Sequence, residues 1–282
     1  MVRMGRNSSG PHQGASEIEA ELQWASAAID RGQPHDAERL ARNVLDRIPQ
    51  HPTALHLLGC ALLLQGHPRQ AVAPLERAAR ASQDPTIETQ LAIALRQSGR
   101  TDDALIRLRR ATKRRPAYPG AFHELGFVLF SSGRVDEAIA VIAQGLELAP
   151  RMPELSILLG GIHHAGRDRA KAKAAYAQAL AVAPEHAGAH YGMGVVLFDD
   201  GEFLLAAEHL ERSVAANPAD AQAQLKLGAC LLELGRSDEA LGRLRTVTRS
   251  EPHLYGVALK VVSSSSRGRF WLRPSSAAKD LA

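Results

Sequence analysis

Small residues recur at a fixed spacing through most of the chain, inside stretches with helical hydrophobic periodicity. Gly126 is followed by Ala138 and then by Pro150 in steps of twelve residues, and ten residues later the cycle restarts at Gly160. Steps of twelve, twelve and ten residues give a period of 34 residues. A period of tens of residues predicts an array of structural repeats rather than a globular core.

Each period contains two predicted helices. Leu125 and Leu129 lie four positions apart around Gly126, as the apolar face of a helix requires. Gly133 predicts the break between the two helices, and Pro150 predicts the end of the second, because Pro has no N–H to donate. Gly or Ala at the small positions indicates that the two helices cross closely. One such pair cannot bury its own apolar face, so stacking on neighbouring pairs is predicted.

The register predicts an all-α fold of seven helix-turn-helix units and a capping helix at 255–266. Gly holds the place of Gly133 in most other units, but Gly166 comes one residue early. The second unit is one residue short, and Gln83 stands where its Pro is expected. The predicted units are 18–51, 52–84, 85–118, 119–152, 153–186, 187–220 and 221–254.

Two segments lie outside the predicted helices. Residues 1–17 are polar and contain Gly, Ser and Pro, which predicts a disordered leader. They lack the apolar run of a signal peptide, which favours a cytoplasmic location. The tail, 267–282, carries Phe270, Trp271 and Leu272. These three side chains either fold back on the last helices or dock a partner or a further domain.

Three short segments recur from unit to unit. They are Leu-Gly at 125–126, Gly-Arg-Val-Asp-Glu-Ala at 133–138 and Leu-Ala-Pro at 148–150; the second recurs as Gly-Arg-Ser-Asp-Glu-Ala at 235–240. Together with the register, they resemble the tetratricopeptide repeat (TPR) family over roughly residues 18–254. The resemblance implies a TPR α-solenoid whose concave surface binds other proteins or peptides.

In this family the concave wall is formed by one face of each first helix. Relative to each small residue, that face comprises the positions three before, one after and four after it, which form a helical stripe. The stripe here is largely apolar, so the resemblance implies a trough for an apolar peptide or helix; the alternative is that neighbouring helices or the tail cover it. The predicted binding residues are His56, Leu63, Ile93, Arg96, His123, Phe127, Phe130, Ile157, His164, Tyr191, Val195, Phe198, Leu225 and Leu232.

A basic run falls on the predicted second helix of the third unit and on the turn after it. It is either a surface for an anionic polymer such as nucleic acid or a solvated outer face with cations favourably placed at a helix C-terminus. Nucleic acid is the disfavoured partner, because the net charge of +4 is low and no aromatic residues interleave with the charges. The run consists of Arg107, Arg109, Arg110, Lys113, Arg114 and Arg115.

No recognisable motif for catalysis, phosphate or metal is present. The sequence has no Gly-rich phosphate loop, no Cys-x-x-Cys and no His-Glu-x-x-His. His186 and His190 have i, i+4 spacing, but no Cys or carboxylate completes a metal set. Cys60 and Cys230 belong to distant units of a stacked array, so no disulfide is expected. No stretch has the length of a transmembrane helix. We therefore expect no enzyme activity, cofactor, metal or membrane span.

The sequence predicts a non-catalytic scaffold or adaptor that binds a protein or peptide ligand in the concave groove. A first alternative is the regulatory or substrate-recruiting part of a transferase-type enzyme or assembly whose catalytic domain lies outside this chain. A second alternative is anionic-polymer binding through the basic outer face. The identity of the partner does not follow from the sequence.

Overall fold

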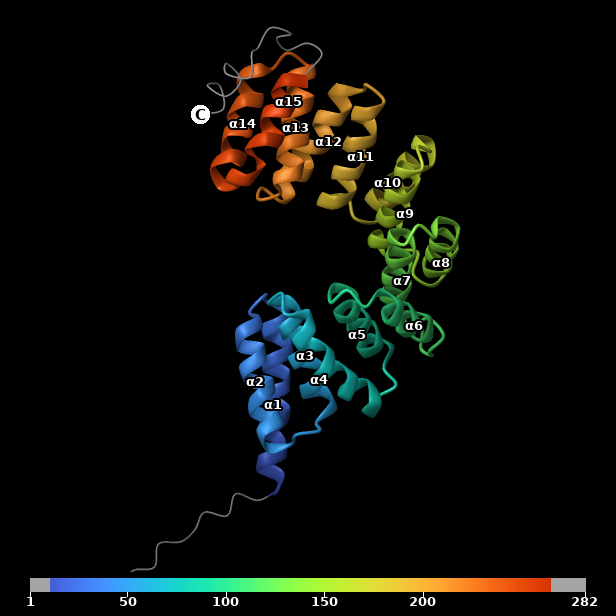
Figure 1. Cartoon of the computed structure of the whole chain (residues 1–282), viewed down its shortest axis with the longest axis vertical. Coiled ribbons are helices and arrows are strands. Elements are labelled where there is room, and N and C mark those ends of the chain that lie inside the picture. The colour runs from blue at the N-terminus through green and yellow to red at the C-terminus, as the bar shows by residue number, and fades with distance from the viewer. Residues whose placement is uncertain (1–10, 265–282) are drawn as a thin grey trace, which may run out of the picture. The chain divides into compact units, whose positions relative to one another are not determined.

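The computed structural model describes residues 11–264 (Figure 1). Of the predicted leader, residues 1–10 lie outside the described residues, and so does the tail with Phe270, Trp271 and Leu272. The chain forms two compact units, which divide after Gln144. We call residues up to Gln144 the first unit and residues from Gly145 onward the second unit, and we call the helix-turn-helix repeats within them pairs.

The first unit is built from helix pairs that follow one another along the chain (Figure 1). The third pair is completed by a short second helix, so the turn after it is long. The boundary between the units falls inside α8, the second helix of the fourth pair. The helices are α1 (Pro11–Asp30), α2 (Pro34–Arg47), α3 (Pro52–Leu64), α4 (Pro68–Ala81), α5 (Pro85–Gln97), α6 (Thr101–Ala111), α7 (Pro119–Ser131) and α8 (Val135–Leu148).

The second unit continues the same alternation and closes with a single helix. Its pairs are α9 (Pro153–Ala165) with α10 (Arg169–Val182), α11 (Ala187–Asp199) with α12 (Phe203–Ala216), and α13 (Ala221–Glu233) with α14 (Ser237–Ser250). A short 3-10 turn η1 (Pro252–Leu254) leads into α15 (Tyr255–Ser264). Over the described residues all regular structure is helical, which confirms the predicted all-α repeat fold.

Prolines mark both kinds of helix end. The second helices α2, α10 and α12 each end before a register proline: Pro49, Pro184 and Pro218. Other prolines open helices, as Pro85 does in α5, because its missing N–H has no partner in the first turn anyway. The side chain of Asp84 caps that helix by accepting from the Thr86 N–H at 2.8 Å.

One boundary differs from the sequence-based expectation. Helix α1 begins at Pro11, so residues 11–17 are helical rather than part of a disordered leader. Pro at the first helical position is favourable, and the polar composition that predicted disorder also suits an exposed helix face. Helix α15 begins at Tyr255, where the sequence placed the start of the capping helix, and the 3-10 turn η1 precedes it.

Close helix crossings at the small positions confirm that part of the prediction. A Cβ placed on Gly59 would lie 2.4 Å from Leu75 Cγ, and one on Gly194 would lie 2.7 Å from Leu210 Cγ. Such distances do not occur between real atoms, so at these two positions any larger residue would force the facing Leu side chain to move. Leu75 and Leu210 are fully buried. The crossing therefore anchors each pair and leaves its outer faces for the neighbouring pairs.

Within each unit the first helices form a continuous row. In the first unit α3 packs on α1 and α5, and α5 also packs on α7. In the second unit α11 packs on α9 and α13, and α15 packs on α13 in the place of a further first helix. Apart from α8, each second helix contacts the first helix of its own pair and the helix that follows it in the row. The row brings the predicted stripe residues of neighbouring pairs next to one another.

The break between paired helices needs left-handed backbone. Gly133 has φ of 77° there, and the equivalent glycines in most other pairs also have positive φ. In the α9–α10 pair Gly166 is one residue early, and Arg167 occupies the left-handed position with φ of 61°. The helix crossing therefore fixes this backbone conformation even where the residue lacks the freedom of Gly.

We expect Gly192→Ala to destabilise the protein by about 1–3 kcal/mol, because the added Cβ would lie 2.3 Å from the buried Tyr176 ring. Gly242→Ala in α14 is the matched control. Nothing lies within 4 Å of its added Cβ, so the higher helix propensity of Ala should stabilise by roughly 0.5–1 kcal/mol. Denaturant unfolding measures both, and equal effects would contradict the close crossing.

We expect Arg167→Gly to stabilise by up to about 1 kcal/mol, because it removes the left-handed penalty of a side chain at the cost of some unfolded-state entropy. The converse change, Gly201→Arg, places a side chain at φ of 78° and should destabilise. Unfolding midpoints compare the two variants. A lower midpoint for Arg167→Gly would show that Arg167 makes a compensating contact.

Candidate interaction surfaces

The first unit presents a face of three adjacent first helices, α3, α5 and α7. Because α5 packs on both neighbours, the predicted stripe residues of these helices lie on one surface. All of them are half-buried except Phe127, which is 36% exposed. We call this set surface A: His56, Leu63, Ile93, Arg96, His123, Phe127 and Phe130.

The centre of surface A is a contact between a cation and an aromatic ring. The Arg96 guanidinium carbon lies 4.9 Å from the centroid of the Phe127 ring. The same guanidinium lies 3.6 Å from Glu124 Oε2, and the His123 Nδ1 atom lies 3.4 Å from Glu124 Oε1. A guanidinium over a ring face contributes about 0.5–2 kcal/mol, depending on solvation. The ring therefore presents both apolar area and a nearby positive charge.

Surface A also holds polar atoms without hydrogen-bond partners. His56 Nε2, Arg96 Nε and Glu124 Oε2 are buried and have none among the described residues. Burial lowers the pKa of His56, against the opposing charge of Asp84, so the ring is neutral at pH 7. A buried polar atom without a partner costs roughly 1–3 kcal/mol.

The second unit has a smaller equivalent on α9 and α11. We call it surface B: Ile157, His164, Tyr191, Val195 and Phe198, all half-buried. Its aromatic residues contact neighbouring repeats. The Lys226 Nζ atom of α13 lies 4.6 Å from the centroid of the Phe198 ring, and Phe203 meets that ring edge-on at 5.3 Å. His164 Nε2 lies 2.8 Å from Asp199 Oδ2 and so links α9 to α11.

Two predicted binding residues do not reach the surface. Leu225 and Leu232 of α13 are each 4% exposed and belong to the apolar core of the second unit. Ala258 and Val262 of α15 are in the same core. Because α15 packs on α13, it covers the stripe at the end of the row. The prediction that these two leucines line a binding surface was wrong.

The predicted binding residues do not include two residues that contact these surfaces. Glu124 and Lys226 both stand two positions before a small residue, at Gly126 and Gly228. This position is adjacent to the stripe: Glu124 pairs with Arg96 of α5, and Lys226 lies over the Phe198 ring of α11. A charged residue there beside an aromatic stripe is the signal that could have identified them.

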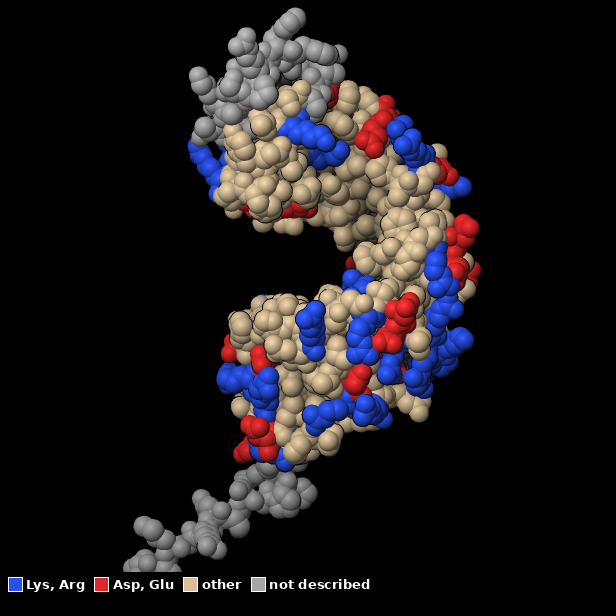
Figure 2. All heavy atoms as spheres, in the orientation of Figure 1, with Lys and Arg blue, Asp and Glu red and all other residues tan. Residues whose placement is uncertain are grey.

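The basic run around α6 is largely engaged in the fold. Arg107 Nη1 lies 3.4 Å from the carboxylate of Glu88, which is 1% exposed. Arg109 pairs with Glu137 at 3.1 Å, and Arg114 donates to Gln83 Oε1 at 2.7 Å. On the face shown in Figure 2, acidic side chains lie among the basic ones. These partners reduce the charge that remains for an anionic ligand.

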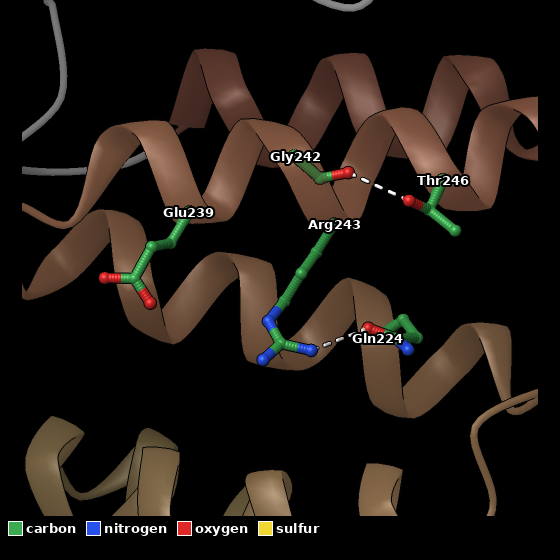
Figure 3. Close-up of a pocket in the computed structure, with 5 residues that line it drawn as sticks. All are labelled: Gln224, Glu239, Gly242, Arg243 and Thr246. Carbon is green, nitrogen blue, oxygen red and sulfur yellow. Dashed lines mark hydrogen bonds between the residues drawn. The ribbon is translucent and has the colours of Figure 1, made fainter.

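A hollow of about 320 Å³ lies between α13 and α14 (Figure 3). Arg243 points towards Gln224 and donates to its Oε1 at 3.3 Å, and the Thr246 hydroxyl donates to the Gly242 carbonyl at 3.1 Å. Glu239 is the remaining lining residue and lies apart from these bonds in Figure 3. Glu239 accepts from Arg236 at 2.9 Å, so the polar side chains around the hollow are all engaged in the fold.

The described part of the chain contains neither a metal-ligand cluster nor a membrane-spanning helix. Residues 16–263 include no cluster of three or more His, Cys, Asp or Glu side chains arranged to bind a metal ion. The helices between Pro11 and Ser264 are all too short or too polar to cross a membrane. Cys60 and Cys230 are free thiols.

Comparisons with known families agree with the repeat register. One family model described as Tetratricopeptide repeat matches residues 22–85, 89–153 and 159–214, and a second matches residues 197–260. Together they cover well over half of the chain. The chain belongs to the TPR family. No curated protein sequence matches this TPR chain.

Solved structures share the fold at low sequence identity. The APC/C hetero-tetramer Cut9–Hcn1 matches 86% of this chain with a TM-score of 0.73 and 15% identity, and this chain spans 48% of that one. A TPR protein from Parabacteroides merdae matches 87% of this chain and 98% of its own, with a TM-score of 0.65 and 15% identity. A thermophilic TPR protein in Thermus thermophilus has 23% identity and a TM-score of 0.53, over 64% of this chain and 97% of that one. These identities show a common fold.

Thiol reactivity tests the burial of the two cysteines. Burial raises the pKa of Cys60 and of Cys230 to about 12, and thiolate is the reactive form. We expect iodoacetamide at about pH 8 to alkylate the folded protein roughly a thousandfold more slowly than the urea-unfolded chain, since three pKa units separate the two states. Similar rates would show that α3 and α13 expose these thiols.

Proposed function

We propose that this TPR protein is a non-catalytic interaction scaffold that binds an amphipathic helix or extended segment of another protein on surface A of the first unit, with surface B of the second unit as a separate site of the same kind. TPR proteins are generally protein-interaction scaffolds, and the family matches cover most of the chain. The observation that supports this site most directly is the exposed Phe127 ring beneath Arg96 on surface A.

The chemistry of surface A defines the ligand. Phe127, Phe130 and Leu63 offer apolar contact area, and aromatic anchors supply much of the binding energy in many interfaces. Arg96 adds a positive charge beside that area. The matching segment has apolar side chains on one face, and a carboxylate or main-chain carbonyl next to them to accept from Arg96.

The basic outer face is the weaker candidate for binding. Arg107 neutralises a buried carboxylate at Glu88, and Arg109 pairs with Glu137. Charge reversal at Arg107 would therefore destabilise the fold rather than report on binding. Arg110 and Lys113 are better probes of this face, because they are exposed and take part in no ion pair among the described residues.

Peptides selected from a displayed random library on the full chain test the site. We expect Phe127→Ala to weaken binding by about 2–4 kcal/mol, or roughly 30- to 1000-fold in Kd, as interface anchors do. Ile106→Ala is the matched control, since Ile106 is a 60% exposed apolar residue on α6, and it should leave Kd unchanged. Fluorescence anisotropy measures Kd, and circular dichroism confirms that both variants fold.

The same titration separates the two faces. Arg110→Glu with Lys113→Glu should change Kd little. If this double variant abolishes peptide binding while Phe127→Ala leaves it intact, surface A is not the binding site and the outer face takes its place.

A further inference from the structure

One polar contact recurs at the same place in three helix pairs. It joins the residue four positions before the small residue of the first helix to the residue three positions after the small residue of the second, nineteen residues along the chain. In the α5–α6 pair it is Glu88 with Arg107, and in the α13–α14 pair Gln224 with Arg243 (Figure 3). In the α11–α12 pair it consists of two histidines.

The histidine contact is buried and its proton positions are fixed by its surroundings. His190 is 1% exposed, and its Nε2 lies 2.8 Å from the Pro184 carbonyl oxygen. A carbonyl only accepts, so His190 Nε2 carries a hydrogen and donates it. In the neutral ring Nδ1 is then an acceptor, and it lies 2.9 Å from His209 Nδ1. His209 Nδ1 therefore donates to His190 Nδ1.

This arrangement takes up fewer protons than the unfolded chain does. One added proton at His209 Nε2 leaves the bond between the rings in place. A second would have to sit on His190 Nδ1, which would then face the His209 Nδ1 hydrogen with two donors and no acceptor. The unfolded chain has no such restriction, and free His titrates near pH 6.5.

The local charges also oppose the first proton. Burial lowers the pKa of His209 most, the neighbouring His190 ring and the positive charge of Arg212 lower it further, and Glu208 acts in the opposite direction. These groups lie on α11 and α12; among the described residues, no charge on α9, α10 or α13, the other helices that pack on this pair, shifts the pKa of His209. Because the folded pKa is depressed, the stabilisation is complete above about pH 6.5 and is lost as the pH falls below it.

We propose that the His190–His209 contact is a pH-sensitive switch, which holds α11 to α12 at neutral pH and releases the two helices under mildly acidic conditions. The equivalent Glu88–Arg107 and Gln224–Arg243 contacts keep a permanently charged arginine and do not lose their bond in this range. Tyr191 of surface B follows His190 directly, so the release also changes surface B. That consequence rests on the proposed function, whereas the switch itself does not.

Amide hydrogen exchange of the full chain tests the switch. Corrected for the intrinsic rates, opening of α11 and α12 should increase about tenfold per pH unit for each proton taken up, between about pH 6.5 and pH 5. The control is the double variant His190→Gln with His209→Arg, which installs the side chains of the Gln224–Arg243 contact. We expect it to match the natural chain at neutral pH and to lose the increase at α11 and α12 on acidification.

A second variant keeps the test decisive should the first fail to fold. Gln224→His with Arg243→His moves the histidine pair into the α13–α14 contact and should make those two helices open on acidification. His56, whose pKa burial also lowers, is retained in both variants and lies in the first unit. The proposal is overturned if α11 and α12 open equally at both pH values in the natural chain, or if the His190→Gln, His209→Arg variant keeps the full acid response.

Discussion

The fold depends on one repeated contact, the close approach of a Gly or Ala on each first helix to a large side chain on the second. Gly228 meets Leu244 in this way, and Gly160 meets Tyr176. Because the two helices of a pair pack so closely, the pair can bury its remaining apolar faces only against its neighbours. Within each unit the row of first helices follows from this stacking, and so does the face that carries surface A in the first unit and surface B in the second.

The fold was predictable because short-range features carry it. The small residues at the helix crossings, the glycines at the left-handed breaks and the prolines at the helix ends can all be read from the sequence, and they recur with one period. Arg167 shows that the helix crossing determines the backbone even where Gly is missing. The start of α1 at Pro11 was not predictable from composition, since polar residues are found both in disordered segments and on exposed helix faces.

The candidate site was predictable only in part, because it depends on contacts between repeats. The stripe positions included Phe127 and Phe198, but not Lys226, which contacts Phe198 from the next first helix. It also placed Leu225 and Leu232 on the surface, since periodicity alone does not show that α15 covers them. The i, i+4 spacing paired His190 with His186, whereas in the structure His190 contacts His209 of α12.

The most direct measurement is the hydrogen-exchange footprint of a library-selected peptide on the full chain. A peptide that lies across the first helices stabilises them against local opening. The account predicts that bound peptide slows exchange in α5 and α7, where Arg96 and Phe127 meet, and leaves the exposed turn after α6 unchanged. Protection confined to α6 and that turn, with α5 and α7 unaffected, would contradict the proposal that this TPR protein binds its partners through surface A.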